Sequence, residues 1–143
     1  TTVATDYFYL EQYDKAIEYH QRAYAIRERL LLEREKNINS QRIVGCVIFW
    51  YKKESMIEQS YIQLALSYYP KLLQTNFDMQ NVLRENLNYF IQLADIVNND
   101  NRLNTFKEEI REKGTSILEW LNHEEKLSEL FKTEIEILRE SLI

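Results

Sequence analysis

The stretch of sequence that decides the fold is Tyr13-Asp-Lys-Ala-Ile-Glu-Tyr-His-Gln-Arg-Ala23. Ala16 and Ala23 lie seven residues apart, which is two turns of an α-helix, so both fall on one face. His20 lies between them on the same face. The spacing therefore predicts a helix that runs from Tyr13 to about Glu35 and packs against a neighbour through this small-residue face.

A related pattern recurs 41 residues farther along the chain. This offset places small or apolar residues on one another in most cases: Ala4 on Gly45, Tyr7 on Ile48, Phe8 on Phe49, Tyr9 on Trp50, Ala16 on Ile57, His20 on Tyr61 and Ala23 on Leu64. Each unit then reads as a short helix that ends near Gln12 or Lys53, a tight turn, and a second helix that packs back on the first.

The segment Tyr13–Ala23 resembles the second helix of a tetratricopeptide repeat (TPR), and its continuation Tyr24–Leu31 resembles the longer repeats of the kinesin light chain type. The resemblance implies an α-solenoid of helix-turn-helix units, with Glu11 where the turn of the family has glycine. It implies that the repeats pack through Tyr13, Ala16, His20, Ala23, Gly45, Ile57, Tyr61 and Leu64. It also implies a concave groove that is lined by Phe8, Tyr9, Phe49 and Trp50.

The composition of the chain favours an all-α fold. Of its 143 residues, 45% are hydrophobic and 29% are charged, a balance typical of a globular protein and not of a disordered one. Two Gly and one Pro supply too little turn chemistry for a β-sandwich or β-barrel. We expect two TPR-like hairpins in residues 1–70, the first one truncated at its start, and then a divergent helical hairpin with a C-terminal capping helix in residues 71–143.

Helical spacing and capping residues predict the bounds of the other helices. Before Pro70, helices are expected at Thr2–Gln12, at Ile43–Lys52 with a cap in Asn37–Ser40, and at Glu54–Tyr69. After Pro70, helices are expected at Phe77–Asn98, at Leu103–Lys113 with Gly114 as its end, and, from a capping box at Ser116–Glu119, over Ile117–Ile143 with a bend near Asn122–His123. This last segment has three basic and seven acidic residues, which suits the polar outer face of a terminal cap.

Signatures of catalysis are missing from the sequence. It has no Gly-rich phosphate loop, no Gly-x-Ser-x-Gly elbow and no paired-His zinc helix, so we expect no enzyme activity, no cofactor and no metal site. His20 has the chemistry of a general base or a metal ligand, but a packing histidine in place of an aromatic residue is the favoured interpretation. His123 is expected in a solvated bend. Cys46, the one cysteine, is expected in the core and agrees with a reducing, cytoplasmic environment.

Aromatic and arginine side chains are the candidate binding groups. Phe8, Tyr9, Phe49 and Trp50 either line a groove or bury themselves against the next helix pair, and the sequence leaves both arrangements open for the apolar run that contains Phe49 and Trp50. Arg42 belongs to a group of arginines between residues 27 and 42. Such a group suits an acidic peptide or a carboxylate, and it equally suits a solvated helix face interspersed with glutamates.

The function expected from these features is the binding of a protein or peptide by a non-catalytic helical-repeat scaffold or adaptor. The alternative is a regulatory or effector-sensing domain of a larger protein, whose ligand is another part of that protein or a small peptide. A pI near 5.2 argues against nucleic acid as the partner, and no apolar run reaches the length of a transmembrane helix. Val3, Tyr7 and Phe8 on the first helix offer an apolar face through which two copies would form a homodimer.

Overall fold

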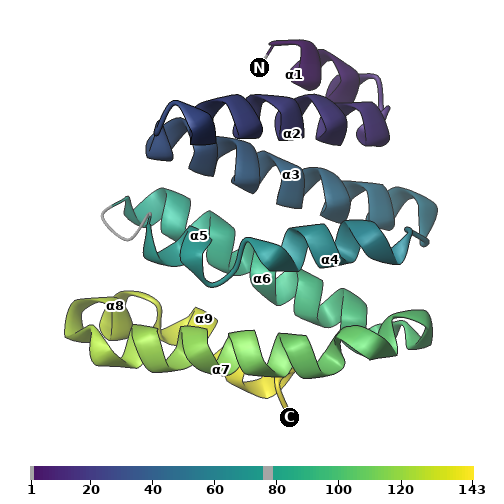
Figure 1. Cartoon of the computed structure of the whole chain (residues 1–143). Coiled ribbons are helices and arrows are strands. Elements are labelled where there is room, and N and C mark those ends of the chain that lie inside the picture. Colours follow the sequence, from purple (N-terminus) through teal and green to yellow (C-terminus); the bar gives the residue numbers. More distant parts are fainter. Residues whose placement is uncertain (1, 76–78) are drawn as a thin grey trace. The chain divides into compact units, whose positions relative to one another are not determined.

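The computed structural model describes residues 2–75 and 79–143, and all the regular structure in these ranges is helical. The prediction of an all-α fold is therefore confirmed. The chain forms two compact units, Thr1–Tyr68 and Tyr69–Ile143. The helices follow one another along the chain (Figure 1) as α1 (Thr2–Tyr9), α2 (Tyr13–Arg29), α3 (Glu33–Glu54), α4 (Gln59–Ser67), α5 (Lys71–Gln74), α6 (Gln80–Asn99), the 3-10 helix η1 (Asn101–Phe106), α7 (Lys107–His123), α8 (Glu125–Leu130) and α9 (Lys132–Ser141).

In the first unit, α1, α2 and α3 lie side by side and the chain reverses direction at each short turn between them (Figure 1). The small-residue face of α2 is buried, as its spacing predicts, and Ala16 and Ile17 are both inaccessible to solvent. Helix α3 buries Ile43 and Val47 in the same core. The small side chains of α2 let the two helices approach closely, and α2 and α3 form the most extensive helix pair of the unit.

Two turns of the first unit have the same unusual backbone conformation. Leu10–Gln12 connects α1 to α2, and Leu30–Leu32 connects α2 to α3. The middle residue of each turn is left-handed, with φ of 59° at Glu11 and 60° at Leu31. Glycine usually occupies this conformation, because any other residue strains its Cβ against the backbone. Both turns therefore exist at an energetic cost that the packing of the helices must offset.

Hydrogen bonds show that both turns are Schellman motifs. At the first turn the N–H of Glu11 donates to the carbonyl oxygen of Phe8 (2.9 Å), and the N–H of Gln12 donates to that of Tyr7 (2.9 Å). The second turn repeats the two bonds at equivalent positions, with lengths of 3.1 and 2.8 Å. Each motif satisfies the last carbonyl groups of one helix just before the next helix begins. Helices α1, α2 and α3 are therefore joined by hydrogen-bonded turns of only three residues each.

The helix predicted from Tyr13 to about Glu35 is wrong at its C-terminal end. The helix stops at Arg29 instead of continuing to Glu35, because the chain reverses at Leu30–Leu32. Helix α3 consequently starts at Glu33. The segment Asn37–Ser40, predicted as a cap, is wrong in that role because it lies inside α3, where three of its four residues are buried.

The other predicted helices of the first unit exist with different ends. The helix expected at Thr2–Gln12 ends at Tyr9, and the one expected at Ile43–Lys52 forms the second half of α3. Ser55, with φ of 54°, ends α3, and the N–H of Ser55 donates to the carbonyl oxygen of Tyr51 (2.7 Å). The helix expected from Glu54 consequently starts later, at Gln59, and Ile57 lies in the connection between the two.

The second unit buries its core among α6, α7 and α9. Phe90 of α6 and Phe131, which lies between α8 and α9, are its largest fully buried side chains. Arg84 of α6 forms an ion pair with Glu134 of α9 and lies over the ring of Phe131. The hydroxyl group of Tyr69 donates to the backbone carbonyl oxygen of Asn86 (2.8 Å). These polar contacts surround α6 and fix it against its neighbours.

Several predicted features of the second unit are wrong. Gly114 does not end a helix but lies buried inside α7, where a Cβ would meet the Cδ2 atom of Leu142 at 2.6 Å. The glycine lets the side chain of Leu142 pack close to α7 and does not form a turn. Ser116–Glu119 is likewise inside α7 and caps nothing. The last segment is not one capping helix, because the chain breaks at Glu124 and again at Phe131.

Other bounds of the second unit agree better with the sequence. The predicted bend near Asn122–His123 is confirmed, since α7 ends at His123. Helix α6 runs from Gln80 to Asn99, and Phe77, where the prediction began, lies outside the described residues. The helix expected from Leu103 starts instead with η1 and continues into α7. Within the described ranges, no helix combines the length and the apolar character that crossing a membrane requires.

Candidate functional site

Aromatic rings from three helices of the first unit meet beside the α1–α2 turn. The ring centroid of Phe8, on α1, lies 5.5 Å from that of Phe49 on α3 and 5.7 Å from that of Tyr13 on α2. Both pairs have the edge-to-face geometry that aromatic rings prefer. Two residues separated by 41 positions in the sequence are thus in direct contact.

Part of this ring cluster faces solvent. Tyr9 is 77% exposed and Phe49 is 45% exposed, whereas Phe8 is half-buried between them. We call Phe8, Tyr9 and Phe49 the aromatic face. Aromatic side chains that remain exposed on an otherwise packed helical unit are typical of interaction surfaces, where they contribute much of the binding energy.

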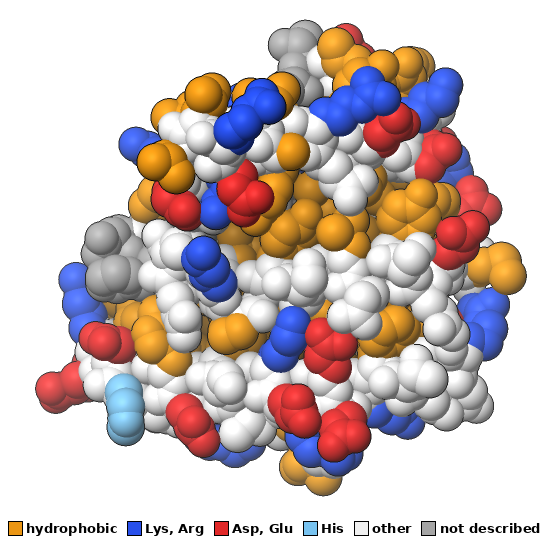
Figure 2. Space-filling model, viewed as in Figure 1, with side chains coloured by type: hydrophobic (Ala, Val, Ile, Leu, Met, Phe, Trp, Pro, Cys, Tyr) orange, Lys and Arg blue, Asp and Glu red, His pale blue; other side chains and the backbone are white. Residues whose placement is uncertain are grey.

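Trp50 points away from the aromatic face. Successive residues of an α-helix are rotated by about 100°, so Trp50 and Phe49 cannot share one face of α3. The ring centroid of Trp50 lies 4.8 Å from that of Tyr61 on α4, and both rings are half-buried. Hydrophobic side chains also gather over α3 and α4 in the view of Figure 2. The structure therefore brings Phe8, Tyr9 and Phe49 together and places Trp50 against α4.

Charged side chains lie around the aromatic face. Nζ of Lys53 is 2.6 Å from Oε2 of Glu11, an ion pair that links the end of α3 to the α1–α2 turn. The hydrogen bond to Glu11 raises the pKa of Lys53 above its ordinary value. Arg42 is exposed on α3 seven residues before Phe49, which is about 10 Å along the same helix face. The surface next to the rings can therefore receive both apolar and anionic groups.

A largely buried chain of polar side chains links α2 to α3 inside the unit. Arg27 of α2 donates to Oδ1 of Asn39 on α3 (2.6 Å), which leaves Nδ2 of Asn39 to donate to Nδ1 of His20 (3.3 Å). Asn39 is 0% exposed and His20 is 2% exposed. Because buried polar groups must find partners, these bonds specify how α2 and α3 align.

Burial makes His20 a weak base. Desolvation, assisted by the positive charges of Arg42 and Arg27, lowers the pKa of His20 from 6.5 to about 4. At neutral pH its ring is uncharged and accepts a hydrogen bond through Nδ1. The favoured interpretation of His20 as a packing residue agrees with this geometry. Burial likewise raises the pKa of the Cys46 thiol to about 12, which keeps the thiol protonated and unreactive.

The remaining residues expected to pack the repeats divide into two groups. The five on α2 and in the middle of α3 are buried, namely Tyr13, Ala16, His20, Ala23 and Gly45. The three that follow α3 are half-buried, namely Ile57, Tyr61 and Leu64. The predicted packing residues are therefore more deeply buried on α2 and α3 than in the segment from Ile57 to Leu64.

Sequence reasoning did not identify Asn39 and Lys36 as buried polar residues. Nζ of Lys36 lies 3.1 Å from Oε1 of Glu33 and 3.8 Å from Oε2 of Glu28, and it lies over the ring of Tyr24 at 5.6 Å. The spacing of Glu33 and Lys36, three residues apart, is the signal that pointed to a helix here. The predicted helix end near Glu35 falls between these two residues.

No group of three or more His, Cys, Asp or Glu side chains among residues 2–75 and 79–143 has the arrangement needed to hold a metal ion. Comparisons with known proteins gave no similarity: the chain matches no family model, no curated protein and no solved structure. A function must therefore be argued from the geometry of the site itself.

Proposed function

We propose that the chain is a non-catalytic helical-repeat module that binds a segment of another protein on the aromatic face. The observation that carries the proposal is the contact between Phe8 and Phe49 at 5.5 Å, with Tyr9 beside them 77% exposed. Rings that contact one another at their edges are held in place before a partner arrives. The rings then lose less conformational entropy on binding than mobile side chains would.

The TPR-like organisation that we propose has two supports within the first unit. Glu11 is left-handed at the position where the family's turn has glycine. Tyr24 of α2 contacts Tyr68, the residue after α4, with ring centroids 5.6 Å apart, and Phe8 of α1 contacts Phe49 of α3. Alternate helices thus contact one another, as consecutive repeats of a solenoid do.

The charge around the aromatic face favours a partner segment that is both apolar and acidic. The second unit and the chain as a whole have a negative net charge, but residues 42–54 of α3, the part that carries Phe49, contain three basic residues (Arg42, Lys52 and Lys53) and one acidic residue (Glu54). Arg42 lies about 10 Å from Phe49 along the helix. A segment with an aromatic or aliphatic side chain and a carboxylate at this separation would occupy both, and its charge would guide the encounter.

The experiment that tests the proposal is selection of peptides from a displayed random library on the purified chain, followed by affinity measurements with a synthetic peptide of the selected sequence. We expect selected peptides to combine apolar with acidic residues, and the variant Tyr9→Ala/Phe49→Ala to bind at least tenfold more weakly. Circular dichroism verifies that the variant folds. Leu31→Ala, which removes an equally exposed side chain at the other end of α2, is the matched control. Equal affinity of wild type and double variant would refute the proposal.

A further inference from the structure

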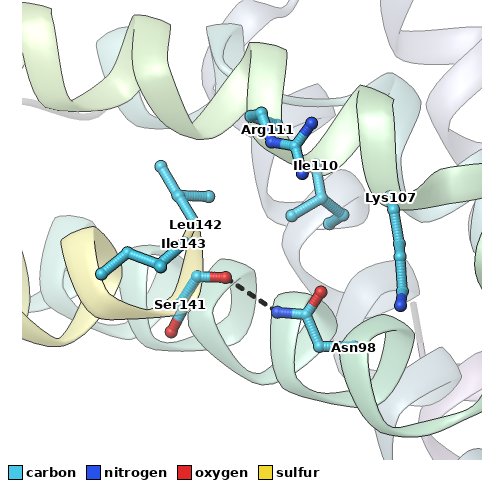
Figure 3. Close-up of a pocket in the computed structure, with 7 residues that line it drawn as sticks. All are labelled: Asn98, Lys107, Ile110, Arg111, Ser141, Leu142 and Ile143. Atoms are coloured by element: carbon cyan, nitrogen blue, oxygen red, sulfur yellow. Dashed lines mark hydrogen bonds between the residues drawn. The ribbon is translucent and has the colours of Figure 1, made fainter.

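A recess in the second unit lies where the end of α6, the start of α7 and the end of α9 meet (Figure 3). It has an empty volume of about 370 Å³, including its open mouth. Because this volume counts open solvent at the mouth, the space inside the recess suits one side chain or a short acid and not a nucleotide. Its lining consists of Asn98, Lys107, Ile110, Arg111, Ser141, Leu142 and Ile143.

Two basic side chains without counter-ions line this recess. Lys107 and Arg111 are four residues apart on α7, a spacing at which like charges repel. Neither forms an ion pair with any residue in the described part of the chain. By contrast, Lys113, farther along the same helix, pairs with Glu109 at 3.0 Å.

The absence of a counter-ion at the recess contrasts with the charge of the unit. Residues 69–143 contain nine basic and fourteen acidic residues, so anions are in excess. An added anion between Lys107 and Arg111 would relieve their repulsion and gain two charge-assisted hydrogen bonds.

Besides the two basic residues, the recess has an apolar part, formed by Ile110, Leu142 and Ile143, and a polar part, formed by Asn98 and Ser141. Ile110 is 2% exposed and Leu142 is half-buried. In Figure 3, Ile110 lies between Arg111 and Lys107, and Leu142 lies across the recess from Lys107. Nδ2 of Asn98 donates to the backbone carbonyl oxygen of Ser141 (2.8 Å), which holds the end of α9 against α6. The wall that presents Leu142 is therefore fixed, while the basic side chains extend from α7.

We propose that this recess binds the carboxylate of an aliphatic acid, with the carboxylate between Lys107 and Arg111 and the aliphatic chain against Ile110 and Leu142. The acid is either a free short-chain acid or the last residue of a peptide, because both present a carboxylate next to a branched apolar group. This site belongs to the second unit and does not depend on the aromatic face. Its test and that of the proposed function therefore fail or succeed separately.

The test uses two pairs of probes with the whole 143-residue chain. The first pair is 4-methylpentanoate and its neutral amide, and the second is the peptide acetyl-Gly-Gly-Leu with a free or an amidated C-terminus. Chemical shift changes in an NMR titration report the dissociation constant and the residues affected. We expect the acids to bind at the resonances of α7 and the end of α9, and the amides to bind at least tenfold more weakly. Binding of the peptide acid alone identifies a peptide terminus as the ligand, and binding of both acids identifies the shared chemistry.

Two double variants complete the test. Lys107→Gln/Arg111→Gln should lower the affinity for the acids at least tenfold. Lys126→Gln/Lys132→Gln removes the same charge from exposed positions of α8 and α9 and should leave the affinity unchanged. The proposal is overturned if neither acid shifts these resonances, if the amides bind as well as the acids, or if both double variants bind equally.

Discussion

Replacing His20 with asparagine tests whether the buried histidine makes the first unit sensitive to acid. Asparagine keeps an acceptor oxygen close to the position of Nδ1, so Asn39 retains its partner, but it does not titrate. In the unfolded chain His20 takes up a proton near pH 6.5, whereas in the folded unit it does so near pH 4. The unfolded state consequently binds more protons between these values. The stabilisation from His20 is complete above pH 6.5 and is lost as the pH falls toward 4.

The size of the effect follows from the two pKa values. A tenfold change in proton affinity corresponds to about 1.4 kcal/mol, so lowering the pKa of His20 from 6.5 to about 4 amounts to about 3 kcal/mol of unfolding free energy. About 2 kcal/mol of this should already be lost at pH 5. At pH 7 the variant should be less stable than the wild type, because asparagine leaves part of the ring volume empty. The difference in unfolding free energy between the wild type and the variant should therefore decrease by about 2 kcal/mol between pH 7 and pH 5.

Urea unfolding of both proteins at a series of pH values measures this difference in unfolding free energy. Trp50 is in the first unit and Trp120 in the second, so a Trp120→Phe background makes the fluorescence report on the first unit alone. His123→Asn, which changes the exposed histidine of the other unit, is the matched control and should parallel the wild type at every pH. An NMR titration of the His20 ring gives its pKa directly. The reasoning is wrong if the His20→Asn and wild-type curves run parallel, or if the ring titrates above pH 6.

Substitutions at Leu31, on the small-residue face of α2 and at Gly114 test the turns and the packing by their effect on stability. Leu31→Gly should raise the free energy of unfolding by about 0.5–1 kcal/mol, because relief of left-handed strain exceeds the entropy cost of glycine, whereas Leu31→Ala, which keeps the Cβ, should not. Ala16→Leu or Ala23→Leu should cost about 1–3 kcal/mol by overpacking the α2 contact, and an unchanged melting temperature would reject that helix face. Gly114→Ala should destabilise the wild type, where the new methyl group meets Leu142, but should stabilise a Leu142→Ala background by up to about 1 kcal/mol through helix propensity. Equal effects in both backgrounds would show that the contact is not tight.

Helix content was predictable because it follows from residue spacing, whereas helix ends depended on turns that leave little trace in composition. The face of α2 that carries Ala16 and Ala23 was found because small residues recur every two turns. The turn at Leu30–Leu32 was not found, because three leucines read as the continuation of an apolar stripe. The opposite error occurred at Gly114, where the residue that usually ends a helix serves a close helix contact.

The candidate site was predictable in part for a similar reason. The 41-residue offset pairs Phe8 with Phe49, and these two rings do contact one another. The same offset pairs Tyr9 with Trp50, yet the structure places Trp50 against Tyr61. An offset specifies equivalent positions along two helices, but the direction of each side chain depends on how the neighbouring helices pack. In the first unit, helix packing also includes the hydrogen bonds of Asn39 to Arg27 and His20. The spacing of apolar residues does not predict such bonds.

The burial of Cys46 has a practical consequence for measuring how often the first unit opens. It is the one thiol of the chain, it lies within α3, and its raised pKa keeps it unreactive while the helix is packed. A thiol reagent can therefore modify the natural sequence only during excursions that separate α3 from its neighbours. The labelling rate reports the frequency of these openings without any substitution. Because the second unit has no thiol, the labelling rate reports the opening of the first unit alone.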